Sequence, residues 1–262
     1  MIRMALLGPR GSGKEQYAEQ LAERYGVPTI SVGELLKQEM DSGSQLGLDI
    51  QKGKKGKKPI HDDMVLQVLL RRLAEKDTDN GFILEGGAKT TAQAEGIDAF
   101  LLRQGRGFAG VVLLRYDYDE FMESMTGRLT CRECGALFNV YTNPPVVERV
   151  CDYCGGRLHS RADDREETIS RRLREYESIE EPLQQFYQDR LQIVDGNFDE
   201  KRVFKAINRA AEKLKRAAPE IQVSSTQEEE VVMAKKEEKK KKAAPKKKAA
   251  PKKKAAPKKK AA

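Results

Sequence analysis

The chain alternates short apolar runs with longer stretches whose apolar residues recur at helical spacing. The runs lie at Ile2–Leu7, Thr29–Val32, Gly81–Glu85, Val111–Leu114 and Gln192–Val194. Their continuous apolar character is typical of strands that are buried on both faces. Between them, the apolar positions of Glu15–Tyr25 and Asp63–Ala74 predict helices. The alternation therefore predicts an α/β fold in which helices cover a parallel sheet.

Two stretches depart from this rhythm. Gln51–Lys58 is rich in glycine and lysine, and Arg128–Arg161 holds all four cysteines and two consecutive prolines. We expect both to be insertions on the α/β core. For Lys52–Lys58 two interpretations stay open. The segment is either a solvated flexible loop or a source of positive charge for a phosphate or polyanion ligand.

A glycine-rich segment follows the first predicted strand and opens the first predicted helix. Gly8-Pro-Arg-Gly-Ser-Gly-Lys14 has the G-x-x-x-x-G-K spacing of a phosphate-binding loop. Its backbone N–H groups can turn toward phosphate oxygens, and Lys14 adds a compact positive charge. The alternative is an ordinary glycine-rich turn. Glu15 and Gln16 stand where serine or threonine is expected. A carboxylate there disfavours phosphate unless it points away or holds a metal indirectly.

The four cysteines form two pairs, Cys131-x-x-Cys134 and Cys151-x-x-Cys154, separated by sixteen residues. This spacing predicts a structural zinc site, in which four thiolates fill the tetrahedral coordination of the metal. Free thiols and an iron site are the alternatives. The site needs no histidine, so we expect His159 to be an ordinary surface residue.

The formal net charge of the 262-residue chain is +8. The excess lies in residues 219–262, where 15 lysines face six acidic residues, while the body before them is almost neutral. The basic character therefore carries no information about the substrate of the body. Three copies of Ala-Ala-Pro-Lys-Lys-Lys predict a disordered tail. It is either a solubilising segment or a weak, salt-sensitive arm for nucleic acid or another polyanion.

The apolar runs also limit where the protein works. None approaches the ~18 residues of a membrane span, and the first apolar stretch is too short for a signal peptide. We therefore expect no membrane contact and a cytoplasmic location, where cysteines serve as metal ligands or free thiols rather than forming disulfides.

The phosphate loop, the four cysteines and several flanking motifs together resemble the zinc-lid adenylate kinases, over about residues 1–212. The flanking motifs are Gly43-x-x-Leu46-Gly47, Asn143-Pro-Pro145, Arg161-Ala-Asp-Asp164 and Arg171-Arg-Leu173. The resemblance implies a P-loop NTPase fold, with a three-layer core over residues 1–127 and 162–218. It further implies a monophosphate-binding insertion at residues 31–65 and a zinc lid at residues 128–161. The implied reaction is Mg²⁺-dependent transfer of the γ-phosphoryl group of ATP to AMP by a monomer.

The same resemblance assigns roles to individual residues. Implied catalytic residues are Lys14, Arg128, Arg161 and Arg172. Implied ATP-binding residues are Gly11, Ser12, Gly13, Lys14, Glu15, Gln16, Arg128, Phe138 and Phe198. Implied AMP-binding residues are Val32, Lys37, Gly86, Lys89, Gln93, Arg161 and Arg172, with Gln93 reading the adenine. Glu85 is implied to hold Mg²⁺ through water.

The chain departs from the family where the chemistry takes place. Lys37 and Lys89 replace arginines, Ser124 replaces another, and Val32 replaces a threonine. Lysine keeps the charge of arginine but loses its two-pronged geometry. Two alternatives to an adenylate kinase therefore remain. One is a kinase for a different nucleoside monophosphate. The other is a catalytically weak nucleotide-binding protein that its basic tail tethers to polyanions.

Overall fold

The computed structural model describes residues 1–56 and 60–217. The predictions of a disordered tail and of a polyanion-binding arm fall on residues 219–262 and therefore lie outside the described part. The same holds for the last residues of the Lys52–Lys58 segment.

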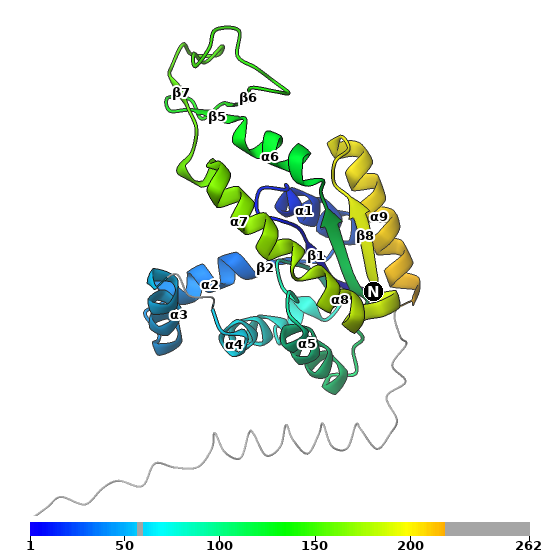
Figure 1. Cartoon of the computed structure of the whole chain (residues 1–262). Coiled ribbons are helices and arrows are strands. Elements are labelled where there is room, and N and C mark those ends of the chain that lie inside the picture. The colour runs from blue at the N-terminus through cyan, green and yellow to red at the C-terminus, as the bar shows by residue number, and fades with distance from the viewer. Residues whose placement is uncertain (57–59, 218–262) are drawn as a thin grey trace, which may run out of the picture. The chain divides into compact units, whose positions relative to one another are not determined.

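The core is a five-stranded parallel sheet with helices on both faces (Figure 1), which confirms the predicted α/β class. Its strand order is β2-β3-β1-β4-β8. The strands are β1 (Ile2–Leu7), β2 (Thr29–Ser31), β3 (Gly81–Glu85), β4 (Gly110–Arg115) and β8 (Leu191–Asp195). All five predicted strands are present. The carboxyl ends of β1, β3 and β4 lie side by side, so the loops that follow them converge at one edge.

Helices cover both faces of the sheet, while α6 and α7 pack against each other. Their bounds are α1 (Lys14–Tyr25), α2 (Val32–Asp41), α3 (Gln45–Lys55), α4 (Asp62–Leu73), α5 (Thr91–Arg103), α6 (Tyr118–Thr126), α7 (Glu166–Glu177), α8 (Glu180–Tyr187) and α9 (Glu200–Ala217). Three short 3-10 turns are η1 (Lys76–Thr78), η2 (Ala162–Asp164) and η3 (Gln188–Arg190). Alternation along β1 directs Ala5 and Leu7 toward α4, α5 and α8, and Met4 and Leu6 toward α1 and α9. Two apolar cores therefore hold the sheet between two helical layers.

Two local predictions need correction. Val32 does not end a strand but begins α2, because the Ser31 side chain accepts a hydrogen bond from Glu34 N–H and caps the helix. The loop interpretation of Lys52–Lys58 is wrong as far as Lys55, which ends α3. Ser44 caps that helix by accepting from Gly47 N–H, and the apolar face of α3 buries Ile50. Capping and burial outweigh the low helix propensity of the glycines within α3.

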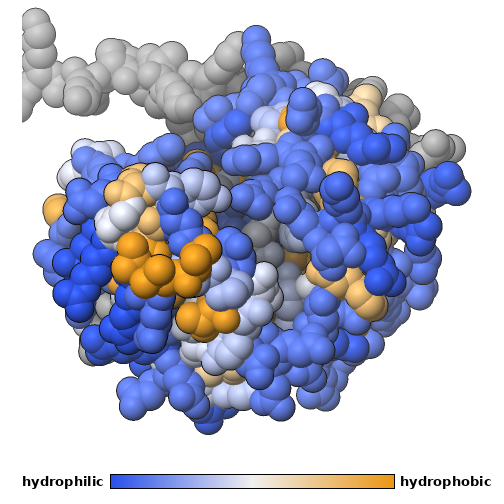
Figure 2. All heavy atoms as spheres, turned by 90° about the horizontal axis from the view of Figure 1, so that it is seen from above, coloured by the Kyte–Doolittle hydropathy of each residue, from blue (hydrophilic) through white to orange (hydrophobic). Residues whose placement is uncertain are grey.

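A small antiparallel sheet forms a separate lobe, with strand order β6-β5-β7. Its strands are β5 (Arg128–Cys131), β6 (Leu137–Asn139) and β7 (Leu158–His159), and α6 and α7 connect this lobe to the core. Figure 2, which views the molecule from the side of this lobe, shows hydrophobic side chains gathered on the surface. The exposed apolar residues of the small lobe include Leu137, Val140, Val146 and Val147. A lobe that leaves so many apolar residues outside its core needs an additional cross-link, such as a bound metal ion, to stay folded.

None of the described helices combines the length and the apolar character that crossing a bilayer requires.

Candidate functional site

The loop between β1 and α1 has the geometry of a phosphate cradle. Gly11 and Gly13 adopt left-handed backbone conformations, with φ values of 97° and 74°. A Cβ atom on Gly11 would lie 2.4 Å from Met125 Cε and 3.2 Å from Arg128 Nη1. A side chain at Gly11 would therefore be strained by the backbone conformation and would have to displace the end of the Met125 side chain. The predicted strand–loop–helix setting of Gly8–Lys14 is confirmed.

Lys14 is buried, and its ammonium group lies between two carboxylates. Lys14 Nζ is 2.9 Å from Glu15 Oε1 and 3.1 Å from Glu85 Oε1. Glu15 therefore does not point away from the lysine. Desolvation raises the pKa of Glu15, but the hydrogen bond from Lys14 and the charge of that group outweigh it and leave the pKa below its usual value. Glu85 is buried and also accepts a hydrogen bond of 2.7 Å from Ser31 Oγ.

Lys89 lies in the same cleft as this cluster. Burial, and then the charge of Lys14, lower the pKa of Lys89, while Glu85 acts in the opposite direction. The Lys89 side chain is crowded by protein atoms and neighbouring charges on one side and exposed to solvent on the other. The preceding loop is strained, because Ala88 has a φ of 59° and is fully buried. Together, Lys14 and Lys89 supply two positive charges at the carboxyl edge of the sheet.

Gln93 is buried in a hydrogen-bond network that fixes the orientation of its amide. Its Oε1 accepts from the Lys89 N–H at 3.1 Å, and its Nε2 donates to Asp62 Oδ1 at 2.7 Å. Thr90 Oγ1 donates to the other Asp62 oxygen at 2.9 Å. A backbone N–H requires the amide oxygen and a carboxylate requires the amide NH₂, so the flip of Gln93 is determined. Sequence reasoning missed Asp62, whose position at the start of α4 indicates only a helix terminus.

Arg128 separates two cavities beside the glycine-rich loop. Its Nη2 donates to Gly11 O at 2.7 Å. A cavity of about 510 Å³ on one side is lined by Gly11, Gly13, Glu15, Gln16, Arg128, Phe138 and Arg161, among others. A cavity of about 490 Å³ on the other side is lined by Gly11, Ser12, Gly13, Ser124, Arg128 and Phe198, among others. Phe138 and Phe198 thus line different cavities rather than one.

The remaining predicted residues lie on α2, on α7 and in the loop after β3. Arg172 on α7 donates to Asp163 Oδ1 at 2.9 Å, an ion pair that lowers the pKa of Asp163. Gly86, directly after Glu85, has a φ of 78° and leads into the loop that carries Lys89. Lys37 is exposed on α2, and Val32 is buried. The structure therefore brings the predicted residues around the glycine-rich loop together, with Arg172 turned toward η2.

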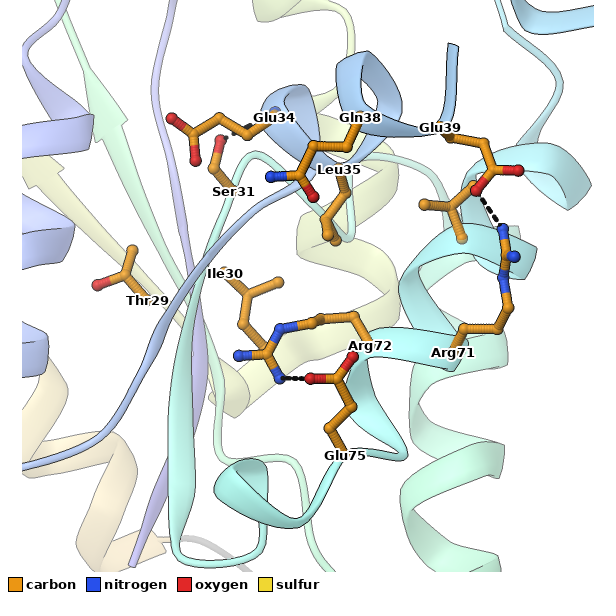
Figure 3. A pocket seen from close by; sticks show the side chains of 11 residues that line it. Thr29, Ile30, Ser31, Glu34, Leu35, Gln38, Glu39, Arg71, Arg72 and Glu75 are labelled. Atoms are coloured by element: carbon orange, nitrogen blue, oxygen red, sulfur yellow. Dashed lines mark hydrogen bonds and ion pairs between the residues drawn. The ribbon is translucent and has the colours of Figure 1, made fainter. Parts of the chain in front are cut away.

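A cavity of about 590 Å³ between β2, α2 and α4 contains none of the predicted site residues. Its two arginines are already paired with carboxylates of its walls (Figure 3). Arg71 contacts Glu39 at 2.6 Å, and Arg72 contacts Glu75 at 3.3 Å. Because both guanidinium groups have carboxylate partners, this cavity is not a candidate for binding an anionic ligand.

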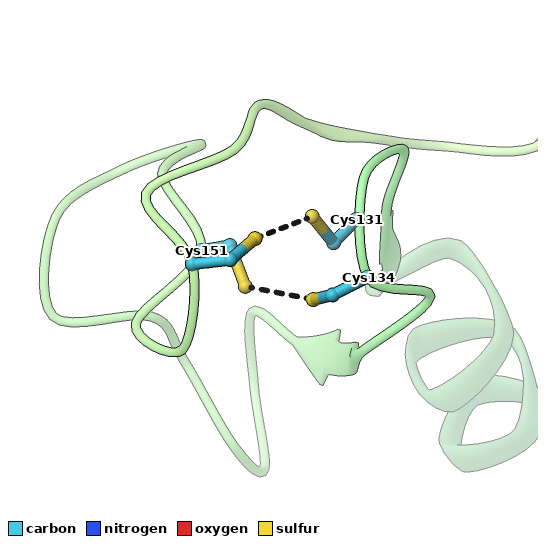
Figure 4. Close-up of side chains that lie close together, drawn as sticks. Cys131, Cys134 and Cys151 are labelled. Atoms are coloured by element: carbon cyan, nitrogen blue, oxygen red, sulfur yellow. Dashed lines mark hydrogen bonds between the residues drawn. The ribbon is translucent and has the colours of Figure 1, made fainter.

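The four cysteines meet between two facing loops of the small lobe (Figure 4). Their Sγ atoms lie within 4.8 Å of one another, with Cys131–Cys154 at 3.4 Å and Cys134–Cys151 at 3.6 Å. These distances are too long for disulfides. They suit a tetrahedral zinc ion, for which Zn–S bonds of about 2.3 Å place sulfurs about 3.8 Å apart. The Cys134 N–H lowers the pKa of Cys131 to about 7. The quartet could therefore bind structural zinc.

Comparison with known proteins agrees with this geometry. A family model described as Adenylate kinase matches residues 6–192. The adenylate kinase of Nitrosococcus oceani is 37% identical over 214 residues, which cover 80% of this chain and 99% of that protein. The adenylate kinase of Archaeoglobus fulgidus is 36% identical over 216 residues, or 82% and 100% of the two chains. That of Bacillus pumilus is 38% identical over 197 residues, or 74% and 91%. Together with the glycine-rich loop and the cysteine quartet, these matches show that the chain belongs to the adenylate kinase family.

Proposed function

We propose that this protein transfers the γ-phosphoryl group of ATP to AMP and so forms two molecules of ADP. The observation that carries the proposal is the convergence of Lys14, Lys89 and Arg128 on a glycine-rich loop, in a chain that belongs to the adenylate kinase family. Phosphoryl transfer needs positioned positive charge more than covalent chemistry, because its transition state spreads negative charge over the equatorial oxygens. This cleft supplies that charge.

The donor triphosphate is proposed to lie along the glycine-rich loop, where the start of α1 presents free N–H groups. Lys14 would contact the β- and γ-phosphates in place of its carboxylate partners. Arg128, held by Gly11, and Arg161 would flank the transferring group. Arg172 would reach that group by exchanging Asp163 for phosphate. Phe138 and Phe198 are the candidate contacts for the donor nucleoside.

Mg²⁺, bound together with ATP, would neutralise charge on the β- and γ-phosphates. The buried Glu85 lies beside Lys14 and is the carboxylate best placed to hold a water molecule of that ion. Ser31, which donates to the second oxygen of Glu85, orients the carboxylate. Because Ser31 would still hold Glu85 after Lys14 turns to the phosphates, the carboxylate could position a metal-bound water.

The acceptor base would be read by Gln93. With Lys89 and Asp62 each using one hydrogen-bonding position, Oε1 keeps a lone pair and Nε2 keeps one hydrogen. This pattern fits the amino group and the adjacent ring nitrogen of adenine. Guanine and uracil present the opposite pattern. Lys37 and Lys89 would meet the acceptor phosphate as point charges, and Val32 and Gly86 would complete the wall of this site.

A coupled assay of ADP formation with AMP, CMP, GMP and UMP as acceptors tests this function. We expect AMP to give the highest kcat/KM, and GMP and UMP to give little turnover. A higher kcat/KM with CMP, GMP or UMP would show that this nucleotide, and not AMP, is the acceptor. A folded, zinc-containing protein with no turnover on any acceptor would remove the proposed activity altogether.

Replacing Asp62 by asparagine is expected to reduce discrimination between AMP and GMP. The asparagine amide can donate as well as accept, so it no longer fixes the flip of Gln93. We expect the AMP-to-GMP ratio of kcat/KM to fall about tenfold, the worth of one hydrogen bond of about 1.4 kcal/mol. Asp63→Asn removes the same charge from an exposed neighbour and is the matched control. Equal ratios in the two variants would show that Asp62 does not orient Gln93.

Glu15 is proposed to compete with ATP for Lys14. Glu15→Gln is therefore expected to lower the KM for ATP about fivefold, because a half-exposed ion pair is worth up to about 1 kcal/mol. Glu23→Gln, at an exposed position of the same helix, is the control. The measurement is the KM for ATP at saturating AMP and fixed Mg²⁺. A higher KM in Glu15→Gln would indicate instead that the carboxylate helps to hold the metal.

We also propose the arrangement that these roles require. Residues 128–161 would form a lid over the donor, residues 31–65 would carry the acceptor, and residues 1–127 and 162–218 would form the core. The protein would act as a cytoplasmic monomer, a location supported by four cysteines that form no disulfide. The charge of residues 219–262 supports a weak polyanion contact. Binding to RNA across a salt series, with and without this segment, tests that contact, and unchanged affinity on its removal would refute it.

A further inference from the structure

A second group of cations lies on the lid, around a cavity that shares no lining residue with the two cavities beside the glycine-rich loop. Three arginines, which we call the lid arginines, line a cavity of about 380 Å³ together with Leu158, His159 and Ser160. The lid arginines are Arg132, Arg149 and Arg157. No acidic side chain lines this cavity. We propose that the lid arginines and His159 form an anion site for a base-free phosphate, either inorganic phosphate or pyrophosphate.

The register of the lid sheet explains how these residues come together. Thr130 lies opposite His159, and Cys131 lies opposite Leu158. Residues that face each other across strands project to the same side of a sheet. Cys131 and Leu158 therefore face the buried lid core, while Thr130 and His159 face the other side. Arg132 directly follows β5 and Arg157 directly precedes β7, and both line the cavity together with His159.

The cationic groups of this cavity are poorly satisfied. Within residues 1–56 and 60–217, Arg149 has only a distant contact of 3.8 Å with the exposed Glu148, and no ion pair is formed by Arg132 or Arg157. The Nδ1 atom of His159 is buried without a hydrogen-bond partner. His159 is thus not the ordinary surface residue that its sequence position predicts. A buried nitrogen without a partner calls for an explanation, of which a bound ion or water molecule is one.

The backbone at this cavity is also strained. Arg149 has a φ of 60°, although it has a side chain and no glycine-like freedom. Its carbonyl oxygen accepts from the Leu158 N–H at 2.9 Å, which ties it to β7. Residues held in this conformation concentrate at ligand sites, where the surrounding structure sustains them. The Arg149 side chain lines the same cavity as Arg132 and Arg157.

The lining chemistry favours a compact phosphate group over a nucleotide or a polynucleotide. Guanidinium groups match phosphate oxygens in pairs. Apart from the imidazole, no aromatic side chain lines this cavity. Proteins that bind single-stranded nucleic acids stack the bases on aromatic side chains, so this cavity does not suit such a ligand. Phosphate and pyrophosphate share the remaining chemistry, and a titration with each distinguishes them by affinity.

The alternative role for the lid arginines is to offset negative charge at the cysteine quartet. Four thiolates around a zinc ion carry net negative charge, and Arg132 directly follows Cys131 in sequence. In that case, replacing the arginines would release zinc and would leave anion binding unchanged. The test therefore measures zinc content together with anion binding.

Imidazole NMR of the full-length, zinc-loaded protein can test the proposal. The chain has only two histidines, so His159→Gln assigns both signals, and His61 reports separately on the monophosphate side of the cleft. We expect pyrophosphate to shift the His159 signal with a dissociation constant on the order of 1 mM or tighter. The double variant Arg132→Gln/Arg157→Gln should weaken this binding at least about tenfold while it retains zinc. Arg171→Gln, an exposed arginine of α7, should leave it unchanged.

Two results would overturn the proposal. One is a His159 signal that pyrophosphate and phosphate do not move, or that moves equally in the double variant. The other is loss of zinc from the double variant together with no anion binding by the unmodified protein, which would assign the arginines to the metal centre. Arg157→Lys keeps the charge and provides a folded variant of intermediate expected affinity if the double variant proves unstable.

Discussion

Replacing Lys14 by methionine is expected to lower kcat/KM for ATP and AMP on the order of a thousandfold, the effect of removing one positioned charge from a transferring phosphoryl group. Methionine keeps much of the length and apolar character of the lysine side chain, so the loop can retain its shape. The lost ammonium group is the one that lies between Glu15 and Glu85. Steady-state kinetics with a coupled assay of ADP formation measures the loss.

The control for this substitution is Lys213→Met, at an exposed position of α9. Thermal unfolding of both variants separates catalysis from stability, because Glu85 loses one partner in Lys14→Met and this costs about 1–3 kcal/mol. The protein should still fold, since Ser31 continues to donate to Glu85. A folded Lys14→Met variant with more than a tenth of the original kcat/KM would show that phosphate is bound elsewhere.

Removal of zinc is expected to unfold the lid while the core stays folded, and to lower kcat/KM about a hundredfold through misplacement of the arginines that the lid carries or adjoins. The lid core is small, formed by Leu129, Phe138 and Leu158 around two buried cysteines, and much of its apolar surface is exposed. Arg128 begins β5, and Arg161 follows β7. Unfolding of this sheet would therefore displace both arginines.

Elemental analysis, proteolysis of the lid and kinetics before and after chelation measure this effect, with re-addition of zinc as the control for damage. Cys134→Ser/Cys154→Ser changes the two exposed ligands and leaves the buried pair, so it should reproduce the chelated state. A metal-free protein with an intact, protease-resistant lid would contradict a structural role for zinc.

Much of this fold could be predicted because local and global signals agree. The runs at Ile2–Leu7 and Gly81–Glu85 are apolar on both faces, which only a covered parallel sheet explains. The glycine-rich loop was identifiable from its spacing, and its context of strand and helix is what the structure contains. The cysteine spacing likewise predicted that the four sulfurs meet, because two short loops suffice to bring them together.

The features that sequence could not predict depend on side-chain partners distant along the chain. Asp62 holds Gln93 across 31 residues, and Glu85 meets Ser31 across 54. Neither pairing has a periodic signal. Glu15 could have pointed toward or away from Lys14, and only packing determines which. Lys52–Lys55 read as a loop because glycine and lysine dominate the segment, whereas capping by Ser44 and burial of Ile50 make it helical.

Transfer of label from [γ-³²P]ATP tests the central claim most directly. With unlabelled AMP and Mg²⁺, we predict that the label moves into ADP, because the γ-phosphoryl group joins the phosphate of AMP, and that ADP forms at two molecules per ATP consumed. Without AMP, the label should stay in ATP. Label released as inorganic phosphate, or label that remains in ATP when AMP is present, would contradict the account.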